Sequence, residues 1–567
     1  MSKLKKSSFL EGAFIATLCI IITKVLGILY VIPFYKIIGN QGGTLYGYAY
    51  NIYNVFLIIS SAGIPLAISK LTSEYNTLGE TDKKRRMYQI ATAVIMFFSI
   101  LSFLVCFIFA PNLSNLIIGE LEGGNTIEDV TFVIRLISFA LLIIPFLSIE
   151  RGYLQGHRYI LEPSISQVIE QVVRITIILA GSYICTYVLK LPPRYAVGIS
   201  VFAACLGGIA TYIYLNTIVK KNKHQIGLDI KPKTTKKEDK EIVKKIILYS
   251  IPFIVINLAN TLYTSTDMIL VIRTLPKLGF NATDTEFISS VFTTWGVKFN
   301  TIITSISTGL IVSLIPNMVK DYTEKNIVAV NNNFNKCLKI ILLIIAPLAI
   351  YLSSMSNSLW NVFYGASEFG PKIIKYTIIV TIFDCLYMVI NSLLQSLNKS
   401  KLIYISVISG LITNLVLDIP LMYLFSKLNL PAYYGAITAT LLGFLLSNSI
   451  SIIYLNKELH LNYQETIKTI PRFILSAIVL VVLFKCFNLI LPINNPSRLV
   501  QVFNLAISGL VGGTIYLLIN FKYIKDLLPK KILNKLKLDK WLRLSIKESL
   551  LVLFHTRFYC FIKTSLK

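Results

Sequence analysis

The stretch from Ile22 to Tyr75 decides the fold class: ITKVLGILYVIPFYKIIGNQGGTLYGYAYNIYNVFLIISSAGIPLAISKLTSEY. It holds the second half of one apolar segment and the whole of another. At about 1.5 Å of helix rise per residue, each full segment is long enough to cross a bilayer. A glycine-rich turn at Gly39, Gly42 and Gly43 is predicted to join them. Two adjacent segments of this length predict a polytopic helical membrane protein.

A single cation, Lys24, lies inside the first of these segments, with Thr23 before it and Gly27 after it. A lysine near the middle of a hydrocarbon span costs about 3 kcal/mol unless it faces water, a partner or a ligand. About 16 Å of helix separates Lys24 from Tyr35 at the outer end, which is far for a side chain that snorkels to the interface. We therefore interpret Lys24 as a cation that lines an aqueous cavity, with snorkelling as the alternative.

The composition identifies the class of protein before any motif does. The chain has 567 residues, of which 54% are hydrophobic, and a mean hydropathy of +0.68. Apolar runs of membrane length recur from end to end, and a soluble domain could not bury that much apolar surface. The net charge of +27 is distributed over alternate loops, as membrane topology requires and as a nucleic-acid-binding patch would not. We predict an all-α polytopic membrane protein with no nucleic-acid partner.

Sequence motifs of enzymes are absent. The chain has no GxxxxGK[ST] nucleotide-binding motif, its four histidines lack metal-ligand spacing, and its eight cysteines form no CxxC pair. We therefore expect a transporter with no catalytic residue, no metal site and no cofactor, driven by the membrane potential or by a coupled ion. The acidic segment GELEGGNTIED at residues 119–129 leaves one enzymatic alternative, a metal-dependent lipid-sugar glycosyltransferase.

Hydropathy predicts about fourteen transmembrane helices. Their approximate bounds are 11–35, 48–70, 88–110, 131–150, 164–187, 195–219, 246–272, 289–316, 337–354, 372–395, 403–425, 434–455, 470–491 and 500–521. An even number places both termini on one side. Basic clusters precede span 1 and follow spans 2 and 6, whereas residues 111–130 contain no Lys or Arg and four carboxylates. We expect a multi-pass protein of the bacterial plasma membrane with both termini cytoplasmic.

One long polar interruption, residues 221–245, separates a predicted N-lobe at residues 1–220 from a C-lobe at residues 246–456. This basic cytoplasmic linker is expected either to hold an interfacial helix on anionic lipid or to be a plain solvated connection. Residues 457–525 contain spans 13 and 14. Residues 526–567 form a basic cytoplasmic tail, whose mixture of apolar residues and cations suits an interfacial helix that transport does not need.

The two lobes resemble each other in sequence. Four matches occur in the same order: Leu154-Gln155 and Ser166 with Leu394-Gln395 and Ser406; residues 213–215 with residues 453–455; Leu113, Asn115 and Gly119 with Leu359, Asn361 and Gly365; and Gly47–Tyr75 with Gly296–Tyr322. They indicate two parallel six-helix repeats, and transporters commonly bind their substrate between such repeats. Spans 13 and 14 have no counterpart in the repeat and are two extra C-terminal helices.

Charged side chains within or beside the spans are the further candidate site residues. They are Lys298 in span 8, Glu170 and Arg174 in span 5, Asp267 in span 7, Asp384 in span 10, Asp418 in span 11, and Arg151 and Arg158 at the inner end of span 4. Glu170 and Arg174, four residues apart on one helix face, are expected to neutralise each other. Asp267 and Asp418 lie toward the outer ends of their spans, where solvation would account for them. Arg151 and Arg158 suit a cytoplasmic entrance or, alternatively, ordinary positive-inside anchors.

Lys24 and Lys298 have no carboxylate within one helical turn of sequence. Their counter-charge must come from elsewhere, and ammonium groups act as point charges for phosphate. We interpret both lysines as cavity cations that bind a phosphorylated substrate.

Three stretches carry a family resemblance: the one quoted above, SFALLIIPFLSIERGYLQGHR at residues 138–158, and SQVIEQVVRI at residues 166–175. In them the chain is similar to MurJ-type lipid II flippases of the MOP exporter superfamily, in the branch found in Gram-positive bacteria. The resemblance extends over all fourteen spans and is sharpest in the first six. It implies two six-helix lobes around a central cationic cavity, with a groove for the lipid tail formed by spans 13 and 14.

The resemblance also assigns residues and a substrate. Lys24, with Gly27, stands where the family has an arginine in an RxxG pattern, and Lys298 stands where it has an essential cation. Tyr30 replaces a second arginine, and Thr44 lies near the place of a family carboxylate. The implied activity is the flipping of undecaprenyl-diphosphate-linked lipid II by alternating access, with the lipid bilayer and the cell-wall synthesis machinery as partners.

Two alternatives stay open. A flippase for another undecaprenyl-linked glycan, such as a capsule, teichoic or spore-wall precursor, would share the fold and the chemistry. A MATE-like drug or cation antiporter would share the twelve-helix core, but it would favour a carboxylate cavity for cationic substrates.

Overall fold

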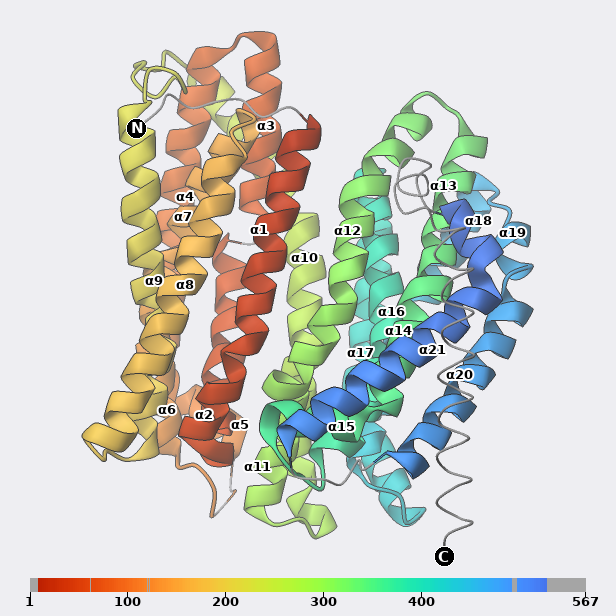
Figure 1. The fold of residues 1–567 in the computed structure, drawn as a ribbon. Coiled ribbons are helices and arrows are strands. Elements are labelled where there is room, and N and C mark those ends of the chain that lie inside the picture. The colour runs from red at the N-terminus through yellow and green to blue at the C-terminus, as the bar shows by residue number, and fades with distance from the viewer. Residues whose placement is uncertain (1–8, 62, 120, 122, 492–496, 528–567) are drawn as a thin grey trace, which may run out of the picture. The chain divides into compact units, whose positions relative to one another are not determined.

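Helices make up all the regular structure in the part of the chain that the computed structural model describes, residues 9–61, 63–119, 121, 123–491 and 497–527 (Figure 1). Twelve of them are long and apolar enough to cross a membrane. The predicted spans 1 and 8 coincide with α1 (Phe9–Leu29) and with the run from α11 (Ala282–Ser290) into α12 (Gly296–Thr323). The all-α polytopic fold is confirmed. Residues 528–567, where the interfacial tail helix is expected, lie outside the described residues.

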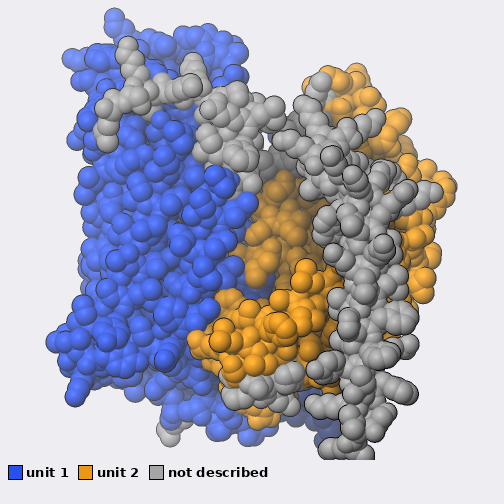
Figure 2. Space-filling view, in the orientation of Figure 1, with its two compact units in different colours: residues 1–299, 394–451 blue, residues 300–393, 452–567 orange. Residues whose placement is uncertain are grey.

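The chain divides into two compact units (Figure 2). Unit 1 is residues 1–299 and 394–451, and unit 2 is residues 300–393 and 452–567. Unit 1 contains α1, α2 (Val31–Ser61), α3 (Ile64–Leu78), α4 (Thr81–Ile108), α5 (Ala110–Ile118), α6 (Ile127–Ser138), η1 (Phe139–Leu142), α7 (Ile144–Gly156), α8 (Leu161–Tyr183), η2 (Ile184–Val188), α9 (Pro193–Lys221), α10 (Lys236–Thr274), η3 (Pro276–Leu278), α11, η4 (Val291–Trp295), the start of α12, α17 (Ser400–Lys427) and most of α18 (Tyr433–Leu459). The predicted lobes are a division by spans, and they stay a prediction.

Unit 2 contains the rest of α12, α13 (Ile327–Ile340), η5 (Ile341–Ile345), α14 (Ala346–Ser354), α15 (Ser356–Tyr364), α16 (Gly370–Ser396), α19 (Gln464–Ile467), α20 (Ile470–Ile490) and α21 (Arg498–Leu527). Its core joins spans 13 and 14 to α14 and η5. Phe484 of α20 and Tyr516 of α21 pack with Leu343, and the Tyr516 hydroxyl donates to the Leu343 carbonyl over 3.0 Å. The lipid-tail groove implied for spans 13 and 14 stays a prediction.

The glycine-rich segment after the first span is helical over most of its length. Gly39 alone leaves the helical conformation there, with φ 66° and ψ −169°, and α2 continues through Gly42 and Gly43. The predicted turn is therefore wrong in its extent. A Cβ on Gly43 would lie 2.5 Å from Cζ2 of Trp295, so the missing side chain admits η4 against α2. Gly47, one turn on, leaves the same kind of space for Thr294. Small residues four apart commonly allow membrane helices to approach closely.

The predicted repeat is visible in the backbone of two short helices. α5 and α15 are each nine residues long. They end at Gly119 and Gly365, with φ 61° and 84°, a region that glycine enters at little cost. The amides of these glycines donate to the carbonyls of Asn115 and Asn361 over 2.8 and 3.2 Å. The matched residues thus perform the same capping in both copies.

The second match also has one backbone geometry. Arg158 and Asn398, which follow the matched Leu-Gln pairs, both have positive φ, of 66° and 58°. In each copy the next amide donates to the leucine carbonyl, that of Leu154 over 3.0 Å and that of Leu394 over 2.9 Å. The residue that adopts the left-handed conformation is therefore an arginine in the first copy and an asparagine in the second.

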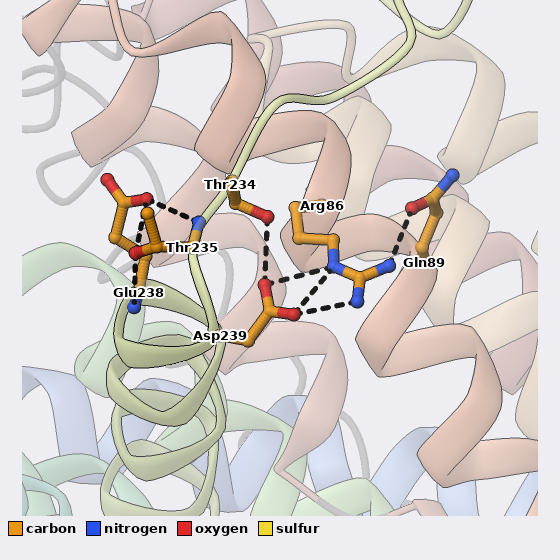
Figure 3. Close-up of polar contacts among 6 residues, drawn as sticks. All are labelled: Arg86, Gln89, Thr234, Thr235, Glu238 and Asp239. Atoms are coloured by element: carbon orange, nitrogen blue, oxygen red, sulfur yellow. Dashed lines mark hydrogen bonds and ion pairs between the residues drawn. The ribbon is translucent and has the colours of Figure 1, made fainter.

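The linker after α9 is folded rather than extended. Its first half turns back so that the Ile226 carbonyl accepts a hydrogen bond from Tyr153 over 2.8 Å. Its second half already belongs to α10, which begins at Lys236 behind a Thr235–Glu238 capping box. The Arg86 guanidinium of α4 donates hydrogen bonds to the Asp239 carboxylate from Nε over 3.0 Å and from Nη2 over 2.7 Å (Figure 3). These contacts fix the start of α10 against α4, and the linker from Lys236 onward belongs to this helix. Whether the linker is an interfacial helix or a plain connection stays a prediction with two alternatives.

Candidate functional site

Lys298 lies one turn beyond the contact between α2 and η4. Its Nζ is 5.8 Å from the centre of the Tyr30 ring, within the range of a cation–π interaction. Tyr30 in turn meets Tyr46, their hydroxyls 3.4 Å apart, and the Tyr46 ring stacks on Trp295 at 6.5 Å. The Tyr30 ring contacts the Lys298 ammonium without supplying a negative charge. Tyr30, which stands where the resemblance gives an arginine, thus contacts Lys298, the second candidate cation.

Lys24 lies on α1, six residues before Tyr30, which corresponds to roughly 9 Å of helix rise. The ammonium is half-buried, and α1 packs along α8 at this level. Gly27 makes that approach possible, because a Cβ there would lie 3.2 Å from Nε2 of Gln171. The structure therefore places both lysines in unit 1.

Arg151, Glu170 and Arg174 form one cluster. The Glu170 carboxylate accepts from Arg151 Nη2 over 2.8 Å and from Arg174 Nη2 over 2.6 Å. The expected pair of Glu170 and Arg174 is present, and Arg151 of α7 joins it from a different helix. Because one carboxylate serves two guanidinium groups, the cluster keeps a net charge of +1. It borders α1 through Gln171, the neighbour of Glu170 in sequence.

Asp267 of α10 lies in a second, uncharged polar environment. Its carboxylate accepts from Asn414 Nδ2 over 3.0 Å and from Thr440 Oγ1 over 2.9 Å, so helices α10, α17 and α18 meet at this side chain. Glycines allow the close packing: a Cβ on Gly410 would lie 2.7 Å from the Gly443 carbonyl oxygen. Asp418 follows Asn414 by one turn on α17 and is close enough to Asp267 for their charges to interact.

Both carboxylates are inside the protein. Asp267 is 7% exposed and Asp418 is 0% exposed, so the expectation that solvent accounts for them is wrong. Neither oxygen of Asp418 has a hydrogen-bond partner among the described residues. Two carboxylates, an amide oxygen and a hydroxyl are the ligands that hard cations prefer, and a shared proton would serve the carboxylates equally. This acidic cluster is the group of residues in unit 1 that fits a coupling ion.

Asp384 is the remaining candidate, and it belongs to α16 in unit 2. Its Oδ1 atom is buried and has no hydrogen-bond partner in the part of the chain that the structure describes. The structure therefore does not join it to the acidic cluster. Its role in a cavity stays a prediction.

Sequence reasoning missed the partners of Asp267 and one further carboxylate. Glu286 of α11, 2% exposed, accepts from the Asn125 amide and from Asn125 Nδ2, both over 3.0 Å. Its carboxyl fills the space beside Gly124, where a Cβ would lie 2.5 Å from Cδ. Glu286 thereby ties α11 to the acidic loop between α5 and α6. A signal did exist, since Asn414 and Asp418 lie four residues apart within an apolar span.

Comparison with known proteins finds two matching family models and a sequence relative. The family model described as Polysaccharide biosynthesis protein matches residues 9–278, and the MatE model matches residues 252–419. The lipid II flippase MurJ of Bacillus subtilis (strain 168) is 29% identical over 540 residues, 93% of this chain and 98% of that protein.

Two solved structures share the fold. One is the lipid II flippase MurJ in an inward closed conformation, with a TM-score of 0.61, 15% identity, and coverage of 89% of this chain and 99% of that chain. The other is an inward-facing MATE family multidrug resistance transporter of the MOP superfamily, with a TM-score of 0.59, 13% identity, and coverage of 77% and 94%. At these identities the structures establish the architecture, while the sequence relative covers nearly the whole chain.

Proposed function

We propose that the chain is a MurJ-type member of the MOP superfamily and that it moves lipid II from the inner to the outer leaflet of the bacterial plasma membrane. The observation that carries the proposal is the similarity to a lipid II flippase over 93% of the chain. The cations in unit 1 agree with it. Lys24, Lys298 and the net charge of the arginine cluster amount to three positive charges in unit 1, which suits a diphosphate.

In the proposed cycle the diphosphate-sugar head enters from the cytoplasm and binds Lys24 and Lys298. The lobes then rock to open outward, while the polyprenyl tail stays in lipid along spans 13 and 14. Arg151 and Arg174 orient the approach, because Glu170 holds both guanidinium groups in place. Both termini face the cytoplasm, where the cell-wall synthesis machinery supplies the substrate.

The acidic cluster supplies the coupling. A proton or an alkali cation at Asp267 and Asp418 offsets the cost of two buried carboxylates, and its release would leave Asp418 buried without a partner charge. The energy available is substantial, since one charge crossing 100 mV releases about 2.3 kcal/mol. Asn414 and Thr440 hold Asp267 in either state.

The alternatives make different demands. A flippase for another undecaprenyl-linked glycan would use the same cations, and only the sugar contacts would differ. A MATE-like antiporter would need carboxylates open to a cationic substrate, whereas Asp267 and Asp418 are enclosed by three helices. The burial of the acidic cluster therefore favours a coupling role over a substrate site.

The test uses the purified full chain in liposomes that contain fluorescent lipid II. A membrane-impermeant reagent that modifies only outer-leaflet lipid II is added at successive times. With the protein present, the modified fraction of lipid II should exceed the fraction that was in the outer leaflet at the start. The Lys24→Ala, Lys298→Ala double variant should abolish this additional modification of lipid II. Lys190→Ala, which removes a lysine that is not a candidate site residue, should retain it. Transport of a teichoic or capsule precursor without transport of lipid II would establish the alternative glycan. Depletion in the host should accumulate lipid II in the inner leaflet.

A further inference from the structure

Unit 1 contains a largely apolar cavity, with charged and hydroxyl groups in its lining, that the proposed cycle does not use. It has a volume of about 590 Å³ and lies between α3, from Leu66 to Leu78, and the end of α7. This size is typical of sites that bind small molecules or headgroups. α3 ends just before the basic run at residues 83–86, so the cavity opens on the predicted cytoplasmic side.

One cation, one carboxylate and three hydroxyl groups of α3 line the cavity, together with two leucines. Lys70 and Ser73 are exposed there, and Ser69 is half-buried. Within the described chain the two serine hydroxyls make no hydrogen bond, so their donors are available to a ligand. Lys70 Nζ lies 3.9 Å from the centre of the Tyr249 ring, which orients the ammonium without neutralising it.

The carboxylate beside Lys70 does not cancel this charge. Glu74, one turn on, also lines the cavity, but its oxygen lies 2.6 Å from Nζ of Lys245 and forms an ion pair with it. Arg158 lines the opposite wall, and its exposed guanidinium has no ion-pair partner among the described residues. Lys70 and Arg158 therefore give the cavity two positive charges.

The backbone at Arg158 shows that the turn itself does not call for an arginine. Its φ of 66° lies in the left-handed region, where asparagine is favoured over long side chains. The second copy of the repeat has Asn398 at this point of the same turn, with φ 58°. The first copy carries the less favourable residue, and what the arginine adds is a cation beside Lys70.

Close helix packing fixes the two walls of the cavity. A Cβ on Gly152 would lie 2.4 Å from the Pro65 carbonyl oxygen, and one on Gly156 would lie 2.6 Å from that of Ser69. α7 is thus in backbone contact with α3 over one turn. Gln155 and Arg158 project beside this contact, and the cavity is preorganised without a ligand.

We propose that this cavity binds the phosphate group of a lipid headgroup at the cytoplasmic membrane surface, through Lys70, Arg158 and the hydroxyls of Ser69 and Ser73. Two lipids carry that chemistry: the polyprenyl diphosphate of the substrate, which would dock here before it reaches Lys24 and Lys298, and an anionic phospholipid. The first source rests on the proposed function, and the second does not.

Binding is measured on the full chain in nanodiscs of phosphatidylcholine, by native mass spectrometry and fluorescence titration. One arm adds undecaprenyl diphosphate, and the other adds phosphatidylglycerol. Arg158→Asn installs the residue of the second copy and is compatible with the turn, and Lys70→Gln removes the other charge. The matched control is Lys190→Asn, which removes a cation at another left-handed position, with φ 50°. Melting temperatures verify that each variant is folded.

Each cavity variant should weaken binding on the order of tenfold, which is the effect of losing one charge-assisted hydrogen bond, while the control binds like the wild type. Weaker binding in the undecaprenyl diphosphate arm identifies a substrate docking site. Weaker binding in the phosphatidylglycerol arm alone identifies a phospholipid site. Unchanged binding in both arms by the folded double variant overturns the proposal. Loss of lipid II transport in the liposome test leaves this measurement standing, so the two failures are distinguishable.

Discussion

The ammonium of Lys298 faces an aromatic ring, whereas the carboxylates of Asp267 and Asp418 lie among amide and hydroxyl groups. A tyrosine ring stabilises a cation without supplying a negative charge, so Lys298 keeps its full attraction for an incoming anion. A carboxylate enclosed by polar groups is suited instead to a small cation or a proton. In the proposed function, individual residues therefore separate the substrate chemistry from the coupling chemistry within one unit.

Lys24→Ala and Lys298→Ala should each lower the affinity for lipid II. A hydrogen bond to a charged group is worth about 1.5–3 kcal/mol, so the dissociation constant should rise at least about tenfold. Lys→Arg at either site should largely retain binding, because the charge survives and a guanidinium suits phosphate. Binding and melting temperature are measured on the same purified variants.

Stability separates this role from a structural one. Removing an intramembrane cation should leave the melting temperature unchanged or slightly higher. Alanine variants that melt earlier and yet bind lipid II normally would assign the lysines to the scaffold. Normal binding by the double alanine variant would end the diphosphate-clamp proposal.

Asp418→Asn should abolish cation-dependent stabilisation of the protein. The wild type should melt at a higher temperature in sodium chloride than in choline chloride, because a ligand at 100 times its dissociation constant stabilises by about 2.7 kcal/mol. The asparagine has the shape of the carboxylic acid and leaves no buried charge, so the variant should fold. Asp384→Asn, which changes a carboxylate outside the acidic cluster, is the control. A sodium-dependent rise that persists in Asp418→Asn would place the ion elsewhere.

At the scale of helices, the absence of side chains at glycines decides which segments meet. At Gly43 and Gly47 the missing side chains allow η4 to pack against α2. At Gly152 and Gly156 they allow α7 to pack against α3. The first contact positions Lys298, and the second forms the walls of the headgroup cavity. Both pairs are four residues apart, so each presents one smooth strip of backbone along its helix.

Gly43→Ala should destabilise the protein. The new methyl would lie 2.5 Å from the fully buried Trp295 ring, and overpacking of this kind costs about 1–3 kcal/mol. Gly513→Ala in α21 is the matched control. A Cβ there has no atom within 4 Å, and alanine is favoured in a helix by about 1 kcal/mol. Thermal unfolding in detergent measures both variants. A Gly43→Ala melting temperature equal to that of the wild type would show that the Trp295 ring shifts without a loss of stability.

The helices themselves were predictable from the sequence, because bilayer thickness and helix rise fix their length. The repeat was predictable too, and the caps at Gly119 and Gly365 show why: a required backbone conformation preserves a residue type. The glycine turn was predicted too long because Gly42 and Gly43 have the composition of a turn. Gly43 instead makes room for Trp295, 252 residues later, and Gly42 for Val197, and no local pattern reveals either contact.

The site was predictable to the same degree. Glu170 and Arg174 were found because they are one turn apart, whereas Arg151 joins them only through packing of α7 on α8. The partners of Asp267 come from two other helices. Asn414 and Thr440 carry no charge, and a single polar residue in a span does not indicate which residue of another helix it contacts. The lysines were found because an intramembrane cation is costly anywhere.

For the whole molecule, the charge of the loops predicts the orientation in the membrane. Single cysteines placed at positions 111–130 should react with an impermeant maleimide added outside the cell, and cysteines at positions 83–86 or 222–233 should react only after permeabilisation. The described loop residue Gly123 and the linker residue Lys231 are suitable labelling sites. External labelling of the linker would reverse the topology and would move the headgroup cavity to the outer surface.

The three-helix contact at Asp267 has a consequence for the order of synthesis. Asn414 is 147 residues downstream, so at about 5–20 residues per second roughly 7 to 30 s pass between the two residues leaving the ribosome. Thr440 arrives later still. During that interval α10 must remain at the translocon, or beside a membrane chaperone, with its carboxylate protonated or solvated. The contacts of α10 in the acidic cluster therefore form late, and the waiting time is set by translation rather than by folding.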